Sequence, residues 1–258
     1  MVGADYSGSA TRRAGKSGFA QGMISAQMAE TPSPKQLAGR SAAEHVATGM
    51  AIGLGTGSTV AFFLEALAER ISKEGLEVVG VPTSLQTAEI AGELGIPVTT
   101  LEEHPVLDLV VDGADEVDGS FRLMKGGGGA LLREKIVAAS ANKVVIIVGA
   151  GKRVETLGTT FLLPVEILPY GYLSTRDKVA SVGGCKPYVR NTEDGEPFVT
   201  DNGNFILDCR FEEGIADPEG LHAALSQIPG VAEIGLFLDL CDVVIEGTDD
   251  GEVVVLNR

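Results

Sequence analysis

A run of four glycines lies between a lysine and a stretch of helix-forming residues. Lys125 comes first, Gly126 to Gly129 follow, and Glu134 lies within the helix predicted over residues 130–140. Glycines let a backbone approach a polar ligand closely, a lysine neutralises negative charge, and a carboxylate near a helix entrance can take a proton. These residues predict an enzyme with a small anionic substrate. A flexible linker is the alternative, but linkers rarely join a strand directly to a well-formed helix.

A second glycine-rich loop, Gly-Leu-Gly-Thr-Gly-Ser-Thr, runs from Gly53 to Thr59 between a predicted strand and a predicted helix. Its backbone N–H groups and the hydroxyls of Thr56, Ser58 and Thr59 can bind an anion at the positive end of the helix dipole. A plain tight turn is the alternative. The loop fits neither a nicotinamide fingerprint, which needs glycine in place of Ser58, nor a P-loop, which needs Gly-Lys-Ser/Thr.

An acidic turn, Asp-Gly-Ala-Asp-Glu-Val-Asp, occupies residues 112–118 after an apolar strand predicted over residues 106–111. Ligands bind at the carboxyl ends of strands in an open parallel sheet, and residues three apart in a turn can point the same way. Asp112 and Asp115 can therefore hold sugar hydroxyls and relay protons. The alternatives are a solvated turn and a divalent-cation loop, although the spacing fails the EF-hand pattern.

The elements that must position these loops alternate along the first part of the chain. The pattern predicts helices over residues 35–48, 59–72, 86–94 and 130–140, the first of them capped by Ser33-Pro34 and ended by Gly49. It predicts strands over residues 50–54, 76–81, 97–101, 106–111 and 144–148. Such alternation indicates an α/β fold with a Rossmann-like, mostly parallel sheet and helices on both faces.

A smaller α+β unit of ferredoxin-like type is predicted beyond Lys152. Its strands are expected over residues 162–168, 187–190 and 204–211, its helices over residues 175–182 and 218–228, and Asp201-Asn202-Gly203 is a hairpin turn. The valine-rich runs in residues 242–256 predict a terminal hairpin that returns to the first sheet. We therefore expect a catalytic domain of residues 33–158 and 238–258, and a small domain of residues 159–237.

The composition of the chain indicates which kinds of partner and cellular compartment are expected. The net charge of −16 and a pI near 4.6 disfavour nucleic acid and anionic membranes, so local lysines must attract an anionic substrate against the overall field. The 3 cysteines and 3 histidines are scattered, which predicts no disulfide framework, no metal site and a reducing cytoplasm. Residues 1–32 are rich in Ser, Ala and Gly; they resemble a transit peptide in composition but lack an amphipathic face, so a disordered extension is favoured.

The loops together resemble ribose-5-phosphate isomerase of the A type. The matching text is Gly53 to Thr59, Val111 to Glu116, Lys125 to Gly128, and Arg133-Glu-Lys135. Further matches are Leu163-Pro-Val-Glu166, Thr200-Asp-Asn-Gly-Asn204, Ile228-Pro-Gly-Val231 and Gly235-Leu-Phe237, so the resemblance covers the chain from about Lys35 onward.

The resemblance implies interconversion of ribose 5-phosphate and ribulose 5-phosphate in the pentose phosphate pathway, through an enediolate, without cofactor or metal. It implies Glu134 as the base, with Asp112, Asp115 and Lys125 assisting catalysis. It further implies a homodimer or a dimer of dimers. The substrate site would be lined by Lys35, Thr56, Gly57, Ser58, Thr59, Asp112, Gly113, Ala114, Asp115, Lys125, Gly126, Gly127, Gly128 and Lys152.

One segment departs from the family pattern. Members of the family usually carry an acidic residue and a serine before the last site lysine, whereas this chain has Gly149-Ala150-Gly151 before Lys152.

Two other functions are alternatives to the isomerase. A sugar-phosphate sensor could use the same scaffold without catalysis, but it would normally carry a basic DNA-binding helix-turn-helix. A dehydrogenase would use the first glycine loop for nicotinamide.

Overall fold

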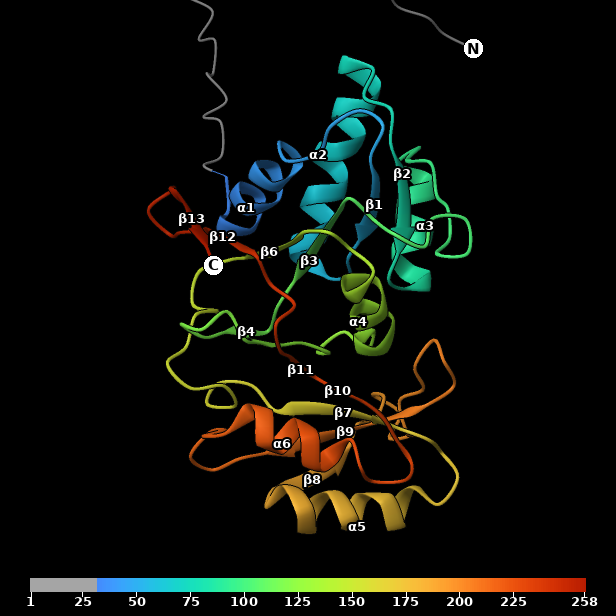
Figure 1. Cartoon of the computed structure of the whole chain (residues 1–258), viewed down its shortest axis with the longest axis vertical. Helices are drawn as coiled ribbons and strands as arrows, with labels where there is room; N and C mark the ends of the chain where they lie inside the picture. The colour runs from blue at the N-terminus through green and yellow to red at the C-terminus, as the bar shows by residue number, and fades with distance from the viewer. Residues whose placement is uncertain (1–31) are drawn as a thin grey trace, which may run out of the picture. The chain divides into compact units, whose positions relative to one another are not determined.

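A six-stranded sheet organises the part of the chain that the computed structural model describes, residues 32–258 (Figure 1). Its strand order is β13-β12-β6-β3-β1-β2, and all neighbours are parallel except the pair β12 and β13. The bounds are β1 Ala51–Leu54, β2 Val79–Pro82, β3 Leu109–Gly113, β6 Val144–Val148, β12 Val243–Gly247 and β13 Val253–Asn257. The predicted terminal hairpin and its return to this sheet are confirmed.

Helices cover both faces of this sheet because its strands are apolar on both sides. Every residue of β6 is buried, and alternate residues join different cores. Val145 and Ile147 pack with α1 (Pro34–Ala43) and α2 (Ser58–Glu74), whereas Ile146 packs on the other face with α4 (Leu131–Ala139). The helix α3 (Leu85–Glu93) follows β2. The predicted α/β class is therefore confirmed.

Among the predicted elements, the first helix and the strand over residues 97–101 differ most from the structure, while the strands predicted over residues 76–81 and 106–111 begin three residues later and the helix over residues 218–228 ends three residues earlier. The first helix ends at Ala43 rather than near Gly49, and the Arg70 guanidinium donates hydrogen bonds to the carbonyls of Ala43 and Val46 (2.8 Å to Val46). A side chain of α2 thus satisfies one carbonyl of the last turn of α1, at Ala43, and one carbonyl beyond the helix, at Val46. The predicted strand over residues 97–101 is reduced to a single parallel bridge between Gly80 and Val98.

A second, antiparallel sheet has the strand order β10-β7-β9-β8. In chain order its elements are β7 (Leu163–Ile167), α5 (Tyr172–Gly183), β8 (Lys186–Val189), β9 (Phe205–Arg210), α6 (Pro218–Leu225) and β10 (Val231–Ile234). This β-α-β-β-α-β arrangement is the ferredoxin-like topology that the sequence predicts. The four-residue strand β10 is missing from the prediction.

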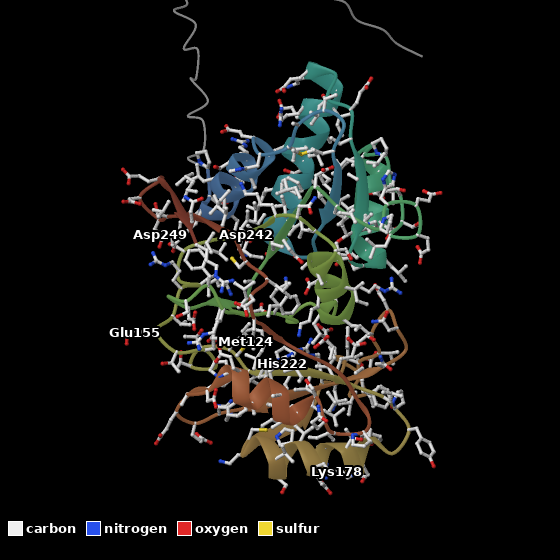
Figure 2. All side chains as sticks on the ribbon, viewed as in Figure 1. Met124, Glu155, Lys178, His222, Asp242 and Asp249 are labelled. Atoms are coloured by element: carbon white, nitrogen blue, oxygen red, sulfur yellow. The ribbon has the colours of Figure 1, made fainter. Side chains whose placement is uncertain are left out.

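A third sheet, β11-β5-β4, consists of three two-residue strands. They are β4 (Glu116–Val117), β5 (Leu123–Met124) and β11 (Leu236–Phe237), and the sequence pattern does not predict them. Met124, labelled in Figure 2, is fully buried and belongs to the core of the antiparallel sheet. Pro32–Arg258 form one compact unit, and the division into domains at residues 158 and 238 stays a prediction.

The prediction for the N-terminal extension falls almost entirely on residues 1–31, which lie outside the described residues. Among the helices of residues 32–258, none combines the length and the apolar character needed to cross a bilayer.

Candidate active site

The loops after β1 and β3 meet at the point where the chain reverses its direction of travel across the sheet. From β1 the chain moves to β2 on one side, and it then returns to β3, β6 and β12 on the other. Thr56 N donates to Asp112 Oδ1 (3.1 Å), which ties the two loops together. A Cβ on Gly55 would lie 2.2 Å from the same oxygen, so only glycine fits there. Such switch points are the usual ligand sites of open α/β sheets.

A cavity of about 130 Å³ opens at this point. Its lining comes from three loops, at residues 57–59, 113–115 and 125–128, together with Lys35, Glu134 and Lys152. The three segments that the sequence singles out therefore converge on one cavity, although they are far apart along the chain.

A buried ionic cluster lies at the cavity, where Lys125 and Glu134 line the wall and Asp112 lies behind them. Lys125 Nζ lies 3.1 Å from Asp112 Oδ2 and 3.3 Å from Glu134 Oε2, and it donates to the Gly113 carbonyl at 2.5 Å. The three side chains are at most 6% exposed. Because two carboxylates share one ammonium group away from water, the charges compensate incompletely.

This imbalance shifts the proton affinity of Glu134. Burial, then repulsion from Asp112, raise the pKa of Glu134 to about 8, while Lys125 opposes the shift. For Lys125, burial disfavours the charged form, but attraction to Asp112 and Glu134 outweighs it and raises the pKa. Glu134 is thus poised to exchange a proton near neutral pH beside a fixed positive charge.

Glu134 reaches the cluster because α4 starts next to the glycine loop. The helix begins at Leu131, so Glu134 lies in its first turn, rather than in the second turn that a start at Ala130 would give. The glycine loop itself is fastened to the acidic turn, since Gly127 N donates to Asp115 Oδ2 at 2.8 Å. A Cβ on Gly127 would come within 2.7 Å of the Asp115 carboxylate, which explains the need for glycine.

The opposite wall has the character of an anion site. The helix α2 begins at Ser58 after Gly57, whose φ of 115° favours glycine, and no side chain caps it. Its first N–H groups therefore have no partner within the helix and lie at the positive end of a 17-residue dipole. Lys35 Nζ donates to Ser58 Oγ at 2.8 Å, which places an ammonium group beside them.

Lys35, on α1, and Lys152, in the loop after β6, both line the cavity. Lys152 follows the Gly149-Ala150-Gly151 segment, and its carbonyl accepts a hydrogen bond from Val117 N at 2.9 Å. A Cβ on Gly149 would lie 3.1 Å from Lys35 Cγ. Gly149 belongs to the segment that departs from the family pattern, and its lack of a side chain leaves room for the aliphatic part of Lys35.

Thr56 and Asp112, which the sequence predicts to line the substrate site, lie behind the cavity wall instead. The Thr56 hydroxyl is 2.7 Å from Thr83 Oγ1, 2.9 Å from Ser84 Oγ and 3.0 Å from Thr87 Oγ1, so it faces a hydroxyl cluster. Thr87 in turn donates to the Gly55 carbonyl at 2.8 Å. This cluster is not among the predicted features, although hydroxyl residues directly after a strand at the sheet edge were a usable signal.

Another acidic residue of the turn has a structural task. Glu116 is fully buried, and its carboxylate accepts hydrogen bonds from Gly158 N (2.6 Å), Thr160 N (2.6 Å) and Phe161 N (2.8 Å). It therefore fixes the loop before β7.

Within residues 32–258, no group of three or more His, Cys, Asp and Glu side chains is arranged to hold a metal ion.

Comparison with known proteins identifies the family. The family model described as ribose 5-phosphate isomerase A (phosphoriboisomerase A) matches residues 79–251. The chain is also 52% identical over 226 residues to ribose-5-phosphate isomerase A of Parvibaculum lavamentivorans, covering 86% of this chain and 96% of the relative. This chain belongs to the ribose 5-phosphate isomerase A family.

Solved structures of ribose 5-phosphate isomerases share the fold. The enzyme from Plasmodium falciparum superimposes with a TM-score of 0.84 at 39% identity, covering 87% of this chain and 97% of that one. A D-ribose-5-phosphate isomerase in complex with phospho-erythronic acid gives a TM-score of 0.83 at 38% identity, with coverage of 87% and 97%. The family resemblance noted from the sequence is confirmed.

Proposed function

We propose that this chain interconverts D-ribose 5-phosphate and D-ribulose 5-phosphate. The observation that carries the proposal is the pairing of Glu134 with Lys125 in the wall of a cavity whose other side is a helix N-terminus. A base beside a cation can move a proton between adjacent carbons, and an anion site across the cavity can hold a phosphate.

In this mechanism the phosphate binds the N-terminus of α2. The N–H groups of residues 57–59 and the Lys35 ammonium neutralise it, and Lys152 adds a second cation at the rim. The cavity spans from this site to the ionic cluster, so a bound sugar phosphate would be held at both ends. Binding energy from the remote phosphate then orients the reacting carbons.

At the other end, ionised Glu134 takes the proton from the carbon next to the carbonyl. The electron pair moves to the carbonyl oxygen, and Lys125 with the N–H groups of the glycine loop stabilises the resulting enediolate. Glu134 then returns the proton to the neighbouring carbon, and a proton shifts between the two oxygens. Asp115, at the cavity wall, assists ring opening and this oxygen-to-oxygen transfer, while Asp112 holds Lys125. The product is an isomer of the substrate, so no redox equivalent is consumed.

We further propose a cytoplasmic enzyme that works without a cofactor, as a homodimer or a dimer of dimers. The three free, buried cysteines support a reducing compartment. The oligomeric state rests on the family resemblance alone.

The test is a coupled assay for ribulose 5-phosphate formation from ribose 5-phosphate, run with a chelator present. We expect turnover that the chelator leaves unchanged. Binding of ribose 5-phosphate in a calorimeter without turnover would instead support the sugar-phosphate sensor. A fluorescence titration that detects nicotinamide binding would favour the dehydrogenase.

A further inference from the structure

Arg190, next to the antiparallel sheet, binds the glycine loop of residues 126–129 and does so from outside the cavity. Arg190 follows β8, and its Nη1 donates to the carbonyls of Gly126 (2.9 Å) and Gly127 (3.0 Å). Its side chain is 16% exposed and does not line the cavity. Arg190 belongs to none of the motifs of the sequence and has no role in the proposed proton transfer.

These contacts set the direction of a backbone donor. In a trans peptide the C=O and the N–H point in opposite directions. Because Arg190 holds the Gly127 carbonyl on the outer side of the loop, the N–H of Gly128 is turned to the other side, where Gly128 lines the cavity. The neighbouring Gly127 N–H is already bonded to Asp115. No partner is found for the Gly128 N–H among residues 32–258.

The guanidinium is itself held rigidly. Asp208 on β9 binds it in a bidentate pair, with Arg190 Nε at 2.9 Å and Nη2 at 2.5 Å from the two carboxylate oxygens. The Arg190 guanidinium also lies 5.9 Å from the centre of the Phe198 ring, and a Cβ on Gly129 would lie 2.6 Å from that ring. A lysine could not reproduce these contacts, because it lacks the planar set of donors that binds Asp208 and the two carbonyls together.

We propose that Arg190 is a positioning residue that aims the Gly128 N–H into the cavity, as a donor to the oxygen that becomes negatively charged in the enediolate. The inference rests on the proposed function, because it assigns the oxyanion to the glycine-loop side of the cavity. Arg190 touches no reacting atom and acts through the peptides that follow Gly126 and Gly127, whose carbonyls it binds.

The kinetic test compares Arg190→Lys and Arg190→Ala with Arg122→Met. Arg122 is a matched control, because it too is a partly buried arginine paired with carboxylates, Asp118 and Glu219, but it contacts no glycine loop. Losing one oxyanion donor costs about 10²–10³ in kcat, so we expect falls of about 10-fold for Arg190→Lys and about 100-fold for Arg190→Ala. The dissociation constant of inorganic phosphate, measured by calorimetry, should not change, and Arg122→Met should keep the wild-type kcat.

Chemical rescue and NMR separate positioning from stability. Millimolar guanidinium should restore part of the kcat of Arg190→Ala and should not raise that of Glu134→Gln. In ¹⁵N-labelled protein, the Gly128 amide resonance should move in Arg190→Lys and stay in place in Arg122→Met. A wild-type kcat in Arg190→Ala, or an equal loss of kcat and phosphate affinity, would overturn the inference. If the wild type itself has no isomerase activity, the proposed function fails, while the Gly128 resonance still reports whether Arg190 orients this peptide.

Discussion

At the scale of single residues, the site depends on two carboxylates that share one buried ammonium group. Asp112 and Glu134 both lie within 3.3 Å of Lys125 Nζ. Water cannot stabilise the second negative charge there, so the cluster favours a proton on Glu134 and releases it near neutral pH. A proton-transfer catalyst needs this property, because a base works best when its pKa is close to the working pH.

Glu134→Gln tests the base directly. The amide keeps the volume of the side chain but cannot accept the substrate proton, so we expect kcat to fall by about 10²–10⁴. Affinity for ribose 5-phosphate should be largely retained, because the phosphate site that we propose, at the start of α2, does not include Glu134. Steady-state kinetics and calorimetry give the two quantities, and an unchanged turnover would remove Glu134 from the mechanism.

The pH profile of kcat/KM tests the charges around Glu134. Since the base must be ionised, kcat/KM should rise with pH along a limb centred near a pKa of about 8. Asp112→Asn removes a negative charge that raises this pKa, so the limb should move to lower pH. Lys125→Met removes a positive charge that lowers it, so the limb should move to higher pH and the rate should also fall. Shifts in the same direction for the two variants would contradict the ionic cluster.

At the scale of elements, glycines let helices and loops approach one another closely enough to assemble the cavity. A Cβ on Gly247 of β12 would lie 1.8 Å from the Pro34 carbonyl oxygen at the start of α1. The predicted cap of this helix, Ser33, is confirmed, because its hydroxyl accepts a hydrogen bond from Gln36 N at 3.3 Å. The close contact of Pro34 with Gly247 of the sheet, however, is what brings Lys35 to Ser58.

Gly247→Ala should therefore weaken both the fold and the anion site. Overpacking against backbone typically costs about 1–3 kcal/mol in the free energy of unfolding, and the displaced helix start should raise KM through Lys35. Gly92→Ala in α3 is the control, because its Cβ would meet open space and its helical backbone suits alanine. Denaturant unfolding and steady-state kinetics measure both effects. Equal stability of the two variants would show that the Gly247 contact is unimportant.

At the scale of the whole described chain, Glu166 of the antiparallel sheet holds a turn, residues 200–204, that is bonded to helices beside the parallel sheet. On β7, Leu163, Val165 and Ile167 pack in the core with α5 and α6, whereas the alternate residue Glu166 points to the other face. Its carboxylate accepts hydrogen bonds from Thr200 Oγ1, Asn202 Nδ2 and Asn204 Nδ2. The turn so held is bonded to two of the helices beside the first sheet: Leu85 N of α3 donates to Asp201 (2.7 Å), and Arg133 Nε of α4 donates to Asn202 (2.9 Å).

Glu166→Leu should destabilise this junction strongly. The change leaves three side-chain donors without their buried acceptor, which we expect to cost about 3–5 kcal/mol in the free energy of unfolding. Glu166→Gln keeps an acceptor oxygen and should cost much less. Urea titrations of both variants measure the difference. A Leu variant as stable as the Gln variant would mean that the turn is held by other contacts.

The sequence by itself determined the features that local chemistry fixes. The helix start at Ser33-Pro34, the strand from Val144 to Val148 and the three loops all follow from caps, apolar runs and glycine patterns of neighbouring residues. The family assignment also followed from these loops. For the same reason, a local pattern could not show that the first helix ends at Ala43, since Arg70 of another helix satisfies its last carbonyl.

Only the tertiary structure decided what each polar group faces. It buried Lys125 between two carboxylates, turned the Thr56 hydroxyl to a cluster of hydroxyls, and placed Arg190 on carbonyls 63 and 64 residues away. Hydrogen bonds and desolvation depend on distances between side chains, and distant parts of a chain acquire such distances only when the sheets have packed. The types of the site residues were therefore written in the sequence, whereas their proton affinities and directions arose from the fold.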